Sequence, residues 1–282
     1  MKELTEIQKI ERSIHKKFRR DIWRPFIAGV QKYKLIQEGD KIAVCISGGK
    51  DSMLMAKLMQ QLHRHSNLPF EPIFMVMNPG YNEINFQKVI ANASRLEIPV
   101  TVFDSDIFKV VSETDRSPCY LCARMRRGYL YSNAQKLGCN KIALGHHMSD
   151  VVETTLMGML FGGQYQVMMP KLHSRNFAGM QLIRPMYCIE ESAINAWKTF
   201  NNLTFINCAC PLAENCNIYD ATGGNSTRQT VKALLANLKK TNKDAEKSVF
   251  KSLQSINLDT AIGYKLNGVH HSFLDNYNPS KN

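Results

Sequence analysis

Short apolar runs alternate with segments of helical periodicity through the first two thirds of the chain. The run KIAVCIS (41–47) is apolar and β-rich, which predicts a buried strand, and 53–65 has the apolar spacing of a helix. The alternation continues with predicted strands at 71–77, 98–104, 141–145 and 183–187 and predicted helices at 83–97, 119–137 and 150–161. This order predicts an α/β fold, a parallel sheet with helices on both faces, whose ligands bind beyond the carboxyl ends of the strands.

The two ends of the chain have a different pattern. Residues 5–34 carry isoleucines at three- or four-residue spacing among basic residues, which predicts one or two helices. Toward the carboxyl terminus we predict a helix at 191–206, an irregular stretch, a basic helical region at 228–255 and a loop-like tail from residue 263. The chain therefore divides into a basic helical arm (1–36), an α/β domain (37–190) and a mostly helical, cysteine-containing region (191–282).

The net charge of the chain indicates the kind of partner that it binds. The formal net charge is +12, the isoelectric point is about 9.3, and residues 1–34 hold ten Lys and Arg against four Asp and Glu. Such a basic balance favours a polyanionic partner, and nucleic acid is the first candidate. A basic face that contacts only solvent is the alternative for any single charged run.

Hydropathy and cysteine content bear on the compartment. No stretch reaches the roughly 18 apolar residues of a membrane span, and the amino terminus lacks the apolar core of a signal peptide. We therefore expect a cytoplasmic protein without a membrane partner. Eight cysteines in a reducing compartment favour metal binding or chemistry over disulfides. Cys45, Cys139 and Cys188 lie in apolar runs and are expected in the core.

The segment SGGKDS stands where the first predicted strand passes into a helix. Its two glycines allow an anion to approach the backbone, and the amides and the helix amino terminus supply positive potential. The Walker pattern does not fit, because Val44 stands where its first glycine belongs. The segment predicts a phosphate-binding loop of six residues: Ser47, Gly48, Gly49, Lys50, Asp51 and Ser52.

SGGKDS after a buried strand resembles the PP-loop signature of ATP pyrophosphatases. Further segments resemble one branch of these enzymes: CYLCARMRRGYLY, KIALGHHMSDVVET, PKLH and IRPMY. On these motifs the chain, from about residue 8 to 210, is identified as a member of the TtcA family, which makes 2-thiocytidine in tRNA. The resemblance implies the PP-loop (HUP-type) fold, conversion of ATP to AMP and pyrophosphate, and Gly145 beside the loop residues at the ATP site.

Cys119 and Cys122 form a CxxC pair that, from the residues alone, fits a redox pair, half of a zinc site or part of an iron–sulfur site. The later segment CACPLAENC adds Cys208, Cys210 and Cys216. The resemblance implies a [4Fe-4S] cluster held by Cys119, Cys122 and a third cysteine, which maps best to Cys208. Cys210 and Cys216 are alternatives, because the family has CxxC where this chain has CxC. Three ligands leave one iron open for the sulfur that is transferred.

The segment GHHMSD follows a predicted strand. The resemblance implies a catalytic role for Asp150 near ATP, in holding Mg²⁺ or in moving a proton. Asp51, within the loop, is a second candidate for holding Mg²⁺ or for fixing the loop geometry. Ser149 replaces the first of two acids that the family has here. His146 and His147 are candidate metal ligands, but adjacent residues of a strand point to opposite sides, so we do not expect both to bind one ion. We expect them instead to line the site or to have a structural role.

Three arginines follow the CxxC pair on one predicted helix. The resemblance places Arg126 at the reaction site, where it can stabilise charge on the phosphate or on the attacked base. Arg124 and Arg127 share another face of the helix and contact either the RNA backbone or solvent.

Together these features predict an ATP-dependent tRNA sulfurtransferase that adenylates a pyrimidine carbonyl, cytidine 32 by resemblance, and replaces its oxygen with sulfur. Its expected partners are tRNA, bound by basic residues at 8–34 and 228–251, and a sulfur donor system, either a cysteine desulfurase or sulfide. A homodimer also fits the resemblance. Two alternatives stay open: a PP-loop enzyme that adenylates another class of substrate, and a zinc-stabilised RNA-binding protein.

Overall fold

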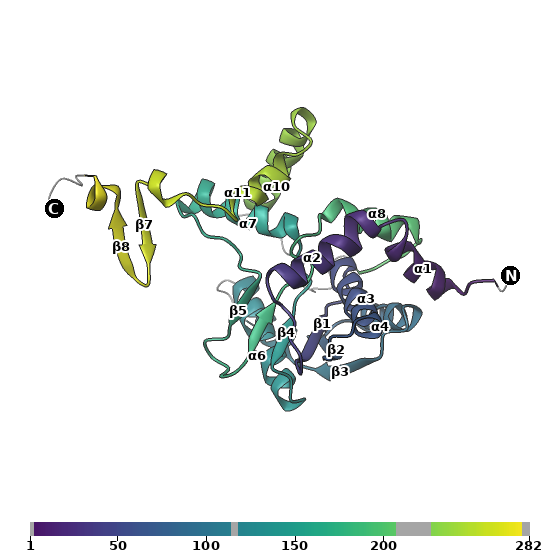
Figure 1. Ribbon diagram of the computed structural model, residues 1–282. Coiled ribbons are helices and arrows are strands. Elements are labelled where there is room, and N and C mark those ends of the chain that lie inside the picture. The colour runs from purple at the N-terminus through teal and green to yellow at the C-terminus, as the bar shows by residue number, and fades with distance from the viewer. Residues whose placement is uncertain (1–2, 114–117, 207–226, 278–282) are drawn as a thin grey trace. The chain divides into compact units, whose positions relative to one another are not determined.

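The computed structural model describes residues 3–113, 118–206 and 227–277 (Figure 1). Two compact units divide the chain, Met1–Lys232 and Ala233–Asn282. The first contains the large sheet, and the second contains helices and a hairpin. The three-part division drawn from the sequence stays a prediction. Within the described ranges, no helix combines the length and the apolar character needed to cross a membrane.

The first unit is built around a six-stranded sheet with the order β3-β2-β1-β4-β6-β5. Its strands are β1 (Lys41–Ile46), β2 (Glu71–Asn78), β3 (Val100–Asp104), β4 (Lys141–Ala143), β5 (Lys171–His173) and β6 (Gln181–Ile183). Neighbouring strands are parallel except β5 and β6, which are antiparallel. The predicted parallel sheet is confirmed, but the last parallel strand is 181–183 rather than 183–187. The sequence analysis missed β5, because its three residues are exposed and form no apolar run.

Helices connect these strands in the predicted order (Figure 1). The amino-terminal part consists of α1 (Glu6–His15), the π-helical turn η1 (Arg19–Trp23) and α2 (Arg24–Lys32). Pro25 lies in the first turn of α2, where a missing amide breaks no helical hydrogen bond. Further helices are α3 (Lys50–His65), α4 (Glu83–Arg95), α5 (Ile107–Ser112), α6 (Pro118–Lys136), α7 (Met148–Gly162) and α8 (Glu191–Phe200). The helix predicted at 191–206 therefore ends at residue 200.

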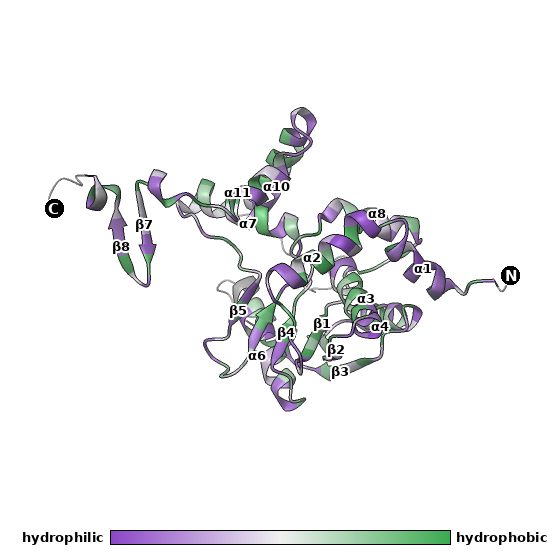
Figure 2. Cartoon of the chain, in the orientation of Figure 1, coloured by the Kyte–Doolittle hydropathy of each residue, from purple (hydrophilic) through white to green (hydrophobic). Residues whose placement is uncertain are grey.

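Alternate residues of β1 face opposite sides of the sheet, and both sides are buried. Ile42 and Val44 belong to a core that includes residues of α1 to α4 and of α8. Ala43 and Cys45 belong to a second core that includes Tyr131 of α6. Figure 2 shows the hydrophobic residues along the central strands and hydrophilic residues along the outer turns of α1. The expectation of helices on both faces is thus confirmed.

The second unit begins within α10 (Thr227–Thr241) and continues with α11 (Ala245–Ser252). The basic helical region predicted at 228–255 is therefore present as two helices. The unit also contains the short helices η2 (Leu258–Thr260) and η3 (Phe273–Asn276) and the strands β7 (Gly263–Leu266) and β8 (Val269–Ser272).

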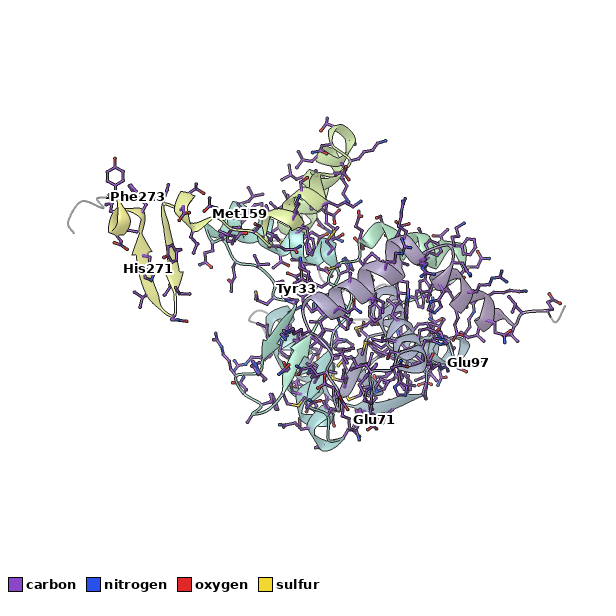
Figure 3. The ribbon with its side chains drawn as sticks, in the orientation of Figure 1. Tyr33, Glu71, Glu97, Met159, His271 and Phe273 are labelled. Atoms are coloured by element: carbon purple, nitrogen blue, oxygen red, sulfur yellow. The ribbon has the colours of Figure 1, made fainter. Side chains whose placement is uncertain are left out.

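The prediction of a loop-like tail from residue 263 was wrong, because β7 and β8 form an antiparallel hairpin. Asn267 and Gly268 make its turn with φ angles of 50° and 88°. Asn-Gly is the sequence signature of a two-residue hairpin turn, since both residues tolerate positive φ. His271, labelled in Figure 3, stacks on Tyr264 of the paired strand with ring centroids 4.7 Å apart.

Candidate active site

The carboxyl ends of the parallel strands form the edge of the sheet at which the phosphate-binding loop lies. Glu71, labelled in Figure 3, begins β2 at the opposite edge, where it pairs with Lys41 (Oε1–Nζ 3.3 Å). β1 ends at Ile46 and α3 begins at Lys50, so the loop stands between a strand end and a helix start, as predicted. The amino terminus of this 16-residue helix supplies positive potential for an anion.

The two glycines of the loop have different tasks. Gly48 has a φ of +85°, and a Cβ there would lie 2.5 Å from Cγ2 of Val89 and 2.6 Å from Cδ1 of Ile206. Only glycine fits this position, because both its backbone conformation and its surroundings exclude a side chain. Gly49 has an extended backbone, and a Cβ there would meet its nearest neighbours at 3.8 Å. The first glycine makes the turn, and the second leaves room beside the loop.

The serine hydroxyls hold the loop in its conformation. Ser52 Oγ accepts a hydrogen bond from the Ser47 amide (3.1 Å) and donates one to the Gly49 carbonyl (3.0 Å). The Tyr81 hydroxyl donates to the Ser47 carbonyl (3.2 Å). These bonds fix the loop without a ligand, and the loop amides are then the natural donors to phosphate oxygens.

A cavity of about 410 Å³ lies beside the loop, a volume within the usual range for small-molecule sites. It brings together residues that the sequence analysis proposed from distant segments: Ser47, Gly49, Asp51, Ser52, Arg126, Gly145 and Asp150. A Cβ on Gly145 would lie 3.1 Å from the Ser52 amide nitrogen, so the segment after β4 packs directly on the loop backbone. Gly48 and Lys50 belong to the loop but not to the wall of this cavity.

The three arginines of α6 differ in their surroundings. Arg126 is half-buried and lines the cavity, and its Nη2 donates to the Tyr81 hydroxyl (3.3 Å). Arg127, which the sequence analysis assigned to RNA or solvent, is exposed but also lines the cavity. Arg124 is exposed and lies outside it. The cavity wall therefore carries two arginines, a suitable environment for phosphate groups.

Asp150 stands in the first turn of α7 with both carboxylate oxygens engaged. The His147 amide donates to its Oδ2 (3.1 Å), and the Asp150 amide donates to Nδ1 of His147 (3.3 Å). Arg228 of α10 contacts Oδ1 at 3.1 Å. His147 thus has the structural role that the sequence analysis favoured, as the cap of α7. The same exchange of hydrogen bonds fixes the Asp150 side chain at the cavity.

Further ion pairs connect Asp150 to the loop. Arg228 also contacts Glu153 (3.4 Å), and Lys232 contacts Glu153 (3.6 Å) and Glu191 (3.4 Å). Lys50 contacts Glu191 (2.9 Å) and Asp51 (3.0 Å). We call these alternating charges the paired cluster; its members are Lys50, Asp51, Asp150, Glu153, Glu191, Arg228 and Lys232.

The pKa values follow from this pairing. Burial by itself would raise the pKa of Glu191, but the hydrogen bond and charge of Lys50, together with the charge of Lys232, lower it to about 2. Burial likewise opposes the charge of Lys50, yet Asp51 and Glu191 raise its pKa. Burial raises the pKa of Glu153, against the effect of its two cationic partners. Lys50 and Glu191 are therefore fully charged near neutral pH.

The sequence analysis did not identify Glu191, Arg228 or Lys232 as site residues. Arg228 is 78 positions from Asp150, and no motif marks the pairing. The sequence analysis assigned the basic region 228–251 to tRNA phosphates, whereas the structure pairs Arg228 and Lys232 with carboxylates. Only the fold could reveal these contacts, since they join helices from separate parts of the chain.

His146 lines the cavity as a neutral imidazole. Burial, followed by the nearby charge of Arg184, lowers its pKa to about 4. Its Nδ1 is buried and has no hydrogen-bond partner among the described residues. Arg184 is itself buried, which lowers its pKa to about 10, and its guanidinium donates to the Met169 carbonyl. A neutral imidazole in this position can donate to or accept from a bound ligand.

The PP-loop domain family matches residues 24–210, a range that includes the loop, Arg126, Gly145 and Asp150. The chain belongs to the PP-loop family. This PP-loop protein is 37% identical over 209 residues to the tRNA-cytidine(32) 2-sulfurtransferase of Syntrophotalea carbinolica, covering 73% of this chain and 77% of the relative. It is 34% identical over 263 residues to the tRNA-cytidine(32) 2-sulfurtransferase of Vibrio parahaemolyticus, covering 90% of this chain and 81% of the relative. The predicted membership of the TtcA family is confirmed, and with it the prediction of a transferase.

A solved structure agrees with the fold of this PP-loop protein. The U34-tRNA thiolase NcsA from Methanococcus maripaludis, solved with its [4Fe-4S] cluster, aligns with a TM-score of 0.62. The alignment covers 83% of this chain and 79% of that chain at 20% identity. The predicted PP-loop fold is thereby confirmed.

Cys122 is the predicted cluster ligand whose side chain the structure describes. It is half-buried on α6 and packs against a small core that contains Met77 and Phe108. The side chain of Cys119 lies outside the described residues, as do the three late cysteines: Cys208, Cys210 and Cys216. Thiolate chemistry fits an iron–sulfur cluster, and the ligand set stays a prediction.

The cysteines expected in the core differ from this pair. Cys45 and Cys139 are buried, as predicted, and burial raises their pKa values to about 12 and about 11. Cys188 is half-buried, and burial raises its pKa as well. These three thiols are protonated near neutral pH, so they are poor nucleophiles and poor metal ligands.

Asp51 and Asp150 have the carboxylate chemistry that Mg²⁺ prefers, but their oxygens are already engaged. Lys50 contacts both oxygens of Asp51, at 3.0 and 3.2 Å, and Asp150 accepts from Arg228 and from a backbone amide. No group of three or more His, Cys, Asp or Glu side chains that could hold a metal occurs among the described residues. This donor set does not fit a resident Mg²⁺, and we derive no step through one.

Proposed function

We propose that this PP-loop protein is an ATP-dependent tRNA sulfurtransferase that replaces the C2 oxygen of cytidine 32 with sulfur. The observation that carries the proposal is the cavity in which the phosphate-binding loop meets Arg126 and Asp150. Similarity to two tRNA-cytidine(32) 2-sulfurtransferases over most of the chain supports the substrate and the base.

ATP is the substrate for which the loop is suited. The loop amides and the start of α3 bind its phosphates, while Arg126 and Arg127 face the same cavity. The C2 carbonyl oxygen of the base attacks the α-phosphorus, an O–P bond forms, and pyrophosphate leaves. The base then carries AMP on its oxygen, which makes C2 susceptible to a nucleophile.

Sulfur enters in the second half of the reaction. A hydrosulfide forms a C–S bond at C2, the C–O bond breaks, and AMP leaves with the former carbonyl oxygen. The hydrosulfide must lose its proton, and the Asp150 carboxylate is the acceptor that we propose. Arg126 stabilises the negative charge that returns to the phosphate of AMP.

A [4Fe-4S] cluster is the cofactor that we propose for sulfur delivery. Cys119, Cys122 and Cys208 would hold it, with Cys210 or Cys216 as the alternative third ligand. When bound, the cluster supplies the sulfur at its open iron. The cluster that the thiolase NcsA holds on a similar fold supports this proposal.

The remaining partners follow from the same reaction. We propose tRNA as the macromolecular substrate and a cysteine desulfurase or sulfide as the source of sulfur. Mg²⁺ would enter only with ATP, since Asp51 and Asp150 are already paired. The cytoplasm and a homodimer stay predictions of the sequence analysis.

The decisive experiment is mass spectrometry of tRNA nucleosides from a strain that lacks the gene. We expect 2-thiocytidine to disappear and to return when the wild-type chain is supplied. The matched control is D150N, which keeps the size of the side chain but removes its charge. In a thiolation assay with purified protein, this variant should retain less than roughly 1% of the wild-type rate, because a general base contributes about 10²-fold or more.

Three outcomes would contradict the proposal. If no thiolated nucleoside is lost from the strain, the protein is not a tRNA sulfurtransferase. If another thiolated nucleoside is lost, cytidine 32 is the wrong base. If the protein purified without oxygen is colourless and holds one zinc instead of about four irons, the zinc-stabilised RNA-binding alternative replaces the enzyme.

A further inference from the structure

A second cavity, of about 570 Å³, lies in the first unit between α1 and the carboxyl-terminal end of α8. It shares no lining residue with the cavity of the candidate active site. Its wall carries one carboxylate, Glu6, and five cationic side chains: Lys9, Arg12, Lys16, Lys17 and Arg95. We call this cavity the α1–α8 groove.

The cations of the groove are mostly without counter-charges. Glu6 is already paired with Arg95 (Oε1–Nε 2.9 Å), and Lys9 is paired with Glu3, which lies outside the lining (Nζ–Oε1 3.7 Å). Arg12, Lys16 and Lys17 are exposed, and none of them forms an ion pair within the described part of the chain. Like charges in one groove repel one another, so an anion that binds across them lowers the electrostatic free energy.

The walls of the groove are held in place by polar contacts. Asn201, just after α8, donates to Oγ of the buried Ser13 of α1 (3.1 Å). Arg95 donates to the Asn202 carbonyl (3.3 Å) as well as to Glu6. The groove is therefore formed before any ligand binds, which reduces the entropy lost on binding.

The lining of the groove also includes an aromatic side chain. Phe200, the last residue of α8, is 50% exposed. The Nζ of Lys17 lies 4.0 Å from the centroid of its ring, which keeps the ammonium at the groove. Aromatic rings beside cations are typical of surfaces that bind single-stranded nucleic acid.

Helix α8 connects the groove to the candidate active site. Its first residue, Glu191, contacts Lys50 of the phosphate-binding loop, and Phe200 lies nine residues further along the helix. At 1.5 Å per residue this separation is about 13.5 Å. A few nucleotides of one RNA strand span such a distance, so a single tRNA could reach both places.

We propose that the α1–α8 groove binds the phosphate backbone of the tRNA near the nucleotide that enters the active site. The inference rests on the proposed tRNA substrate and adds the surface that holds it. The positive charge of the groove favours a polyanion as the ligand. Because the groove lies close to the phosphate-binding loop, we infer that this polyanion is the same RNA whose base reacts there. Lys9, Arg12, Lys16 and Lys17 contact the phosphates, and Phe200 positions Lys17.

Lysine footprinting of the full-length protein tests the groove without any substitution. The lysines are acetylated with and without unmodified tRNA, and the modified positions are read by mass spectrometry. We expect Lys9, Lys16 and Lys17 to be protected by tRNA. The exposed Lys265 of the second unit is the internal control and should stay reactive. Equal reactivity of the groove lysines with and without tRNA overturns the proposal.

Charge reversal gives the second measurement. The double variant R12E/K16E should bind tRNA roughly tenfold more weakly at about 100 mM salt, and the slope of log affinity against log salt should shrink by about 2. The matched control is R19E/R20E, with the same change of charge on the neighbouring turn η1 outside the groove. We expect the control to lose less than about threefold. Both substitutions change exposed residues, so folding should be preserved.

The outcomes separate the groove from the proposed function. If R12E/K16E binds tRNA as the wild type does, or if R19E/R20E is equally weakened, the groove is not the binding surface, whereas thiolation of cytidine 32 can still hold. If neither variant changes tRNA affinity but R12E/K16E loses an acidic protein partner, the groove is a protein-docking surface instead. Loss of 2-thiocytidine in the strain tests the function independently.

Discussion

Two regions of the first unit use charge in opposite ways. In the paired cluster, Lys50, Asp150 and Glu191 have partners of opposite charge within 3.1 Å. In the α1–α8 groove, Arg12 and Lys16 form no ion pair with any residue that the structure describes. The paired charges fix the geometry of the phosphate-binding loop and of Asp150, because each holds its neighbour in place. The unpaired charges favour a ligand that comes from outside the chain.

The difference has an energetic side. In the paired cluster Glu153 is only 3% exposed and Lys50, Asp150 and Glu191 are half-buried, whereas Arg228 and Lys232 are exposed. Removing one partner there leaves a charge without compensation, which costs more than the pair contributes. The cations of the groove are in water, where like charges are screened. Substitutions in the cluster should therefore affect reaction and stability, while substitutions in the groove should affect binding alone.

After D150N, the largest effect is expected for Arg228→Ala. Arg228 holds Oδ1 of Asp150 and contacts Glu153, so its loss should let the Asp150 carboxylate turn away from the cavity. We expect kcat for thiolation to fall roughly tenfold, with KM for ATP changed less than about twofold, because Arg228 does not line the cavity.

Arg228→Lys is the conservative control. It restores one charge-assisted hydrogen bond and should recover most of kcat. Steady-state thiolation assays with saturating tRNA measure both constants. An unchanged kcat for Arg228→Ala, or no recovery with lysine, would show that the ion pair does not position Asp150.

A smaller effect, on stability, is expected for Glu191→Gln. The folded pKa of Glu191 is about 2 against an ordinary value of 4.5. Because the pKa is depressed, the stabilisation is present above pH 4.5 and is lost as the pH falls toward 2. The wild type should lose on the order of 1–2 kcal/mol more than Glu191→Gln between pH 7 and pH 3.

Urea unfolding at a series of pH values measures this difference. The control is Glu38→Gln, since Glu38 is exposed and has no ion pair among the described residues. Parallel pH profiles for the wild type and Glu191→Gln would mean that Lys50 and Lys232 do not stabilise the folded carboxylate.

The smallest effect is expected for the double variant R12A/K16A. Both side chains are exposed and unpaired, so the free energy of unfolding should change by less than about 0.5 kcal/mol. Relief of repulsion could even raise it slightly. Chemical denaturation measures the change. A loss above about 1 kcal/mol would show that the groove cations stabilise the fold, and the contrast between the two regions would fail.

The sequence predicted what depends on neighbouring residues. SGGKDS leads from a strand into the first turn of a helix, as its residues indicated, because the conformational freedom of glycine is a local property. Gly145 and Asp150 were assigned by resemblance, and they lie at the cavity because the strand before them, β4, pairs in parallel with β1. Arg126 was placed by resemblance, and it does line the cavity.

Contacts between distant segments could not be predicted in the same way. Arg228 was read as one cation among many, since nothing near it in the sequence indicates Asp150. Arg127 is exposed, as the assignment to RNA or solvent expected, but it also borders the cavity, which the sequence did not indicate. The hairpin of the second unit had a local signature, Asn267–Gly268, which was overlooked because its strands are only four residues long.

Helix α8 joins the phosphate-binding loop to the α1–α8 groove, so binding at one of these places can be coupled to binding at the other. Its first residue contacts the loop lysine, and its last forms the wall of the groove. A helix of 10 residues moves nearly as a rigid rod, so a tilt at one end displaces the other. If RNA and ATP both favour the same orientation of this rod, each raises the affinity for the other by the same factor, as reciprocity requires. RNA and ATP would then bind with positive cooperativity, and the affinity for ATP would be highest when the RNA that accepts its AMP is bound.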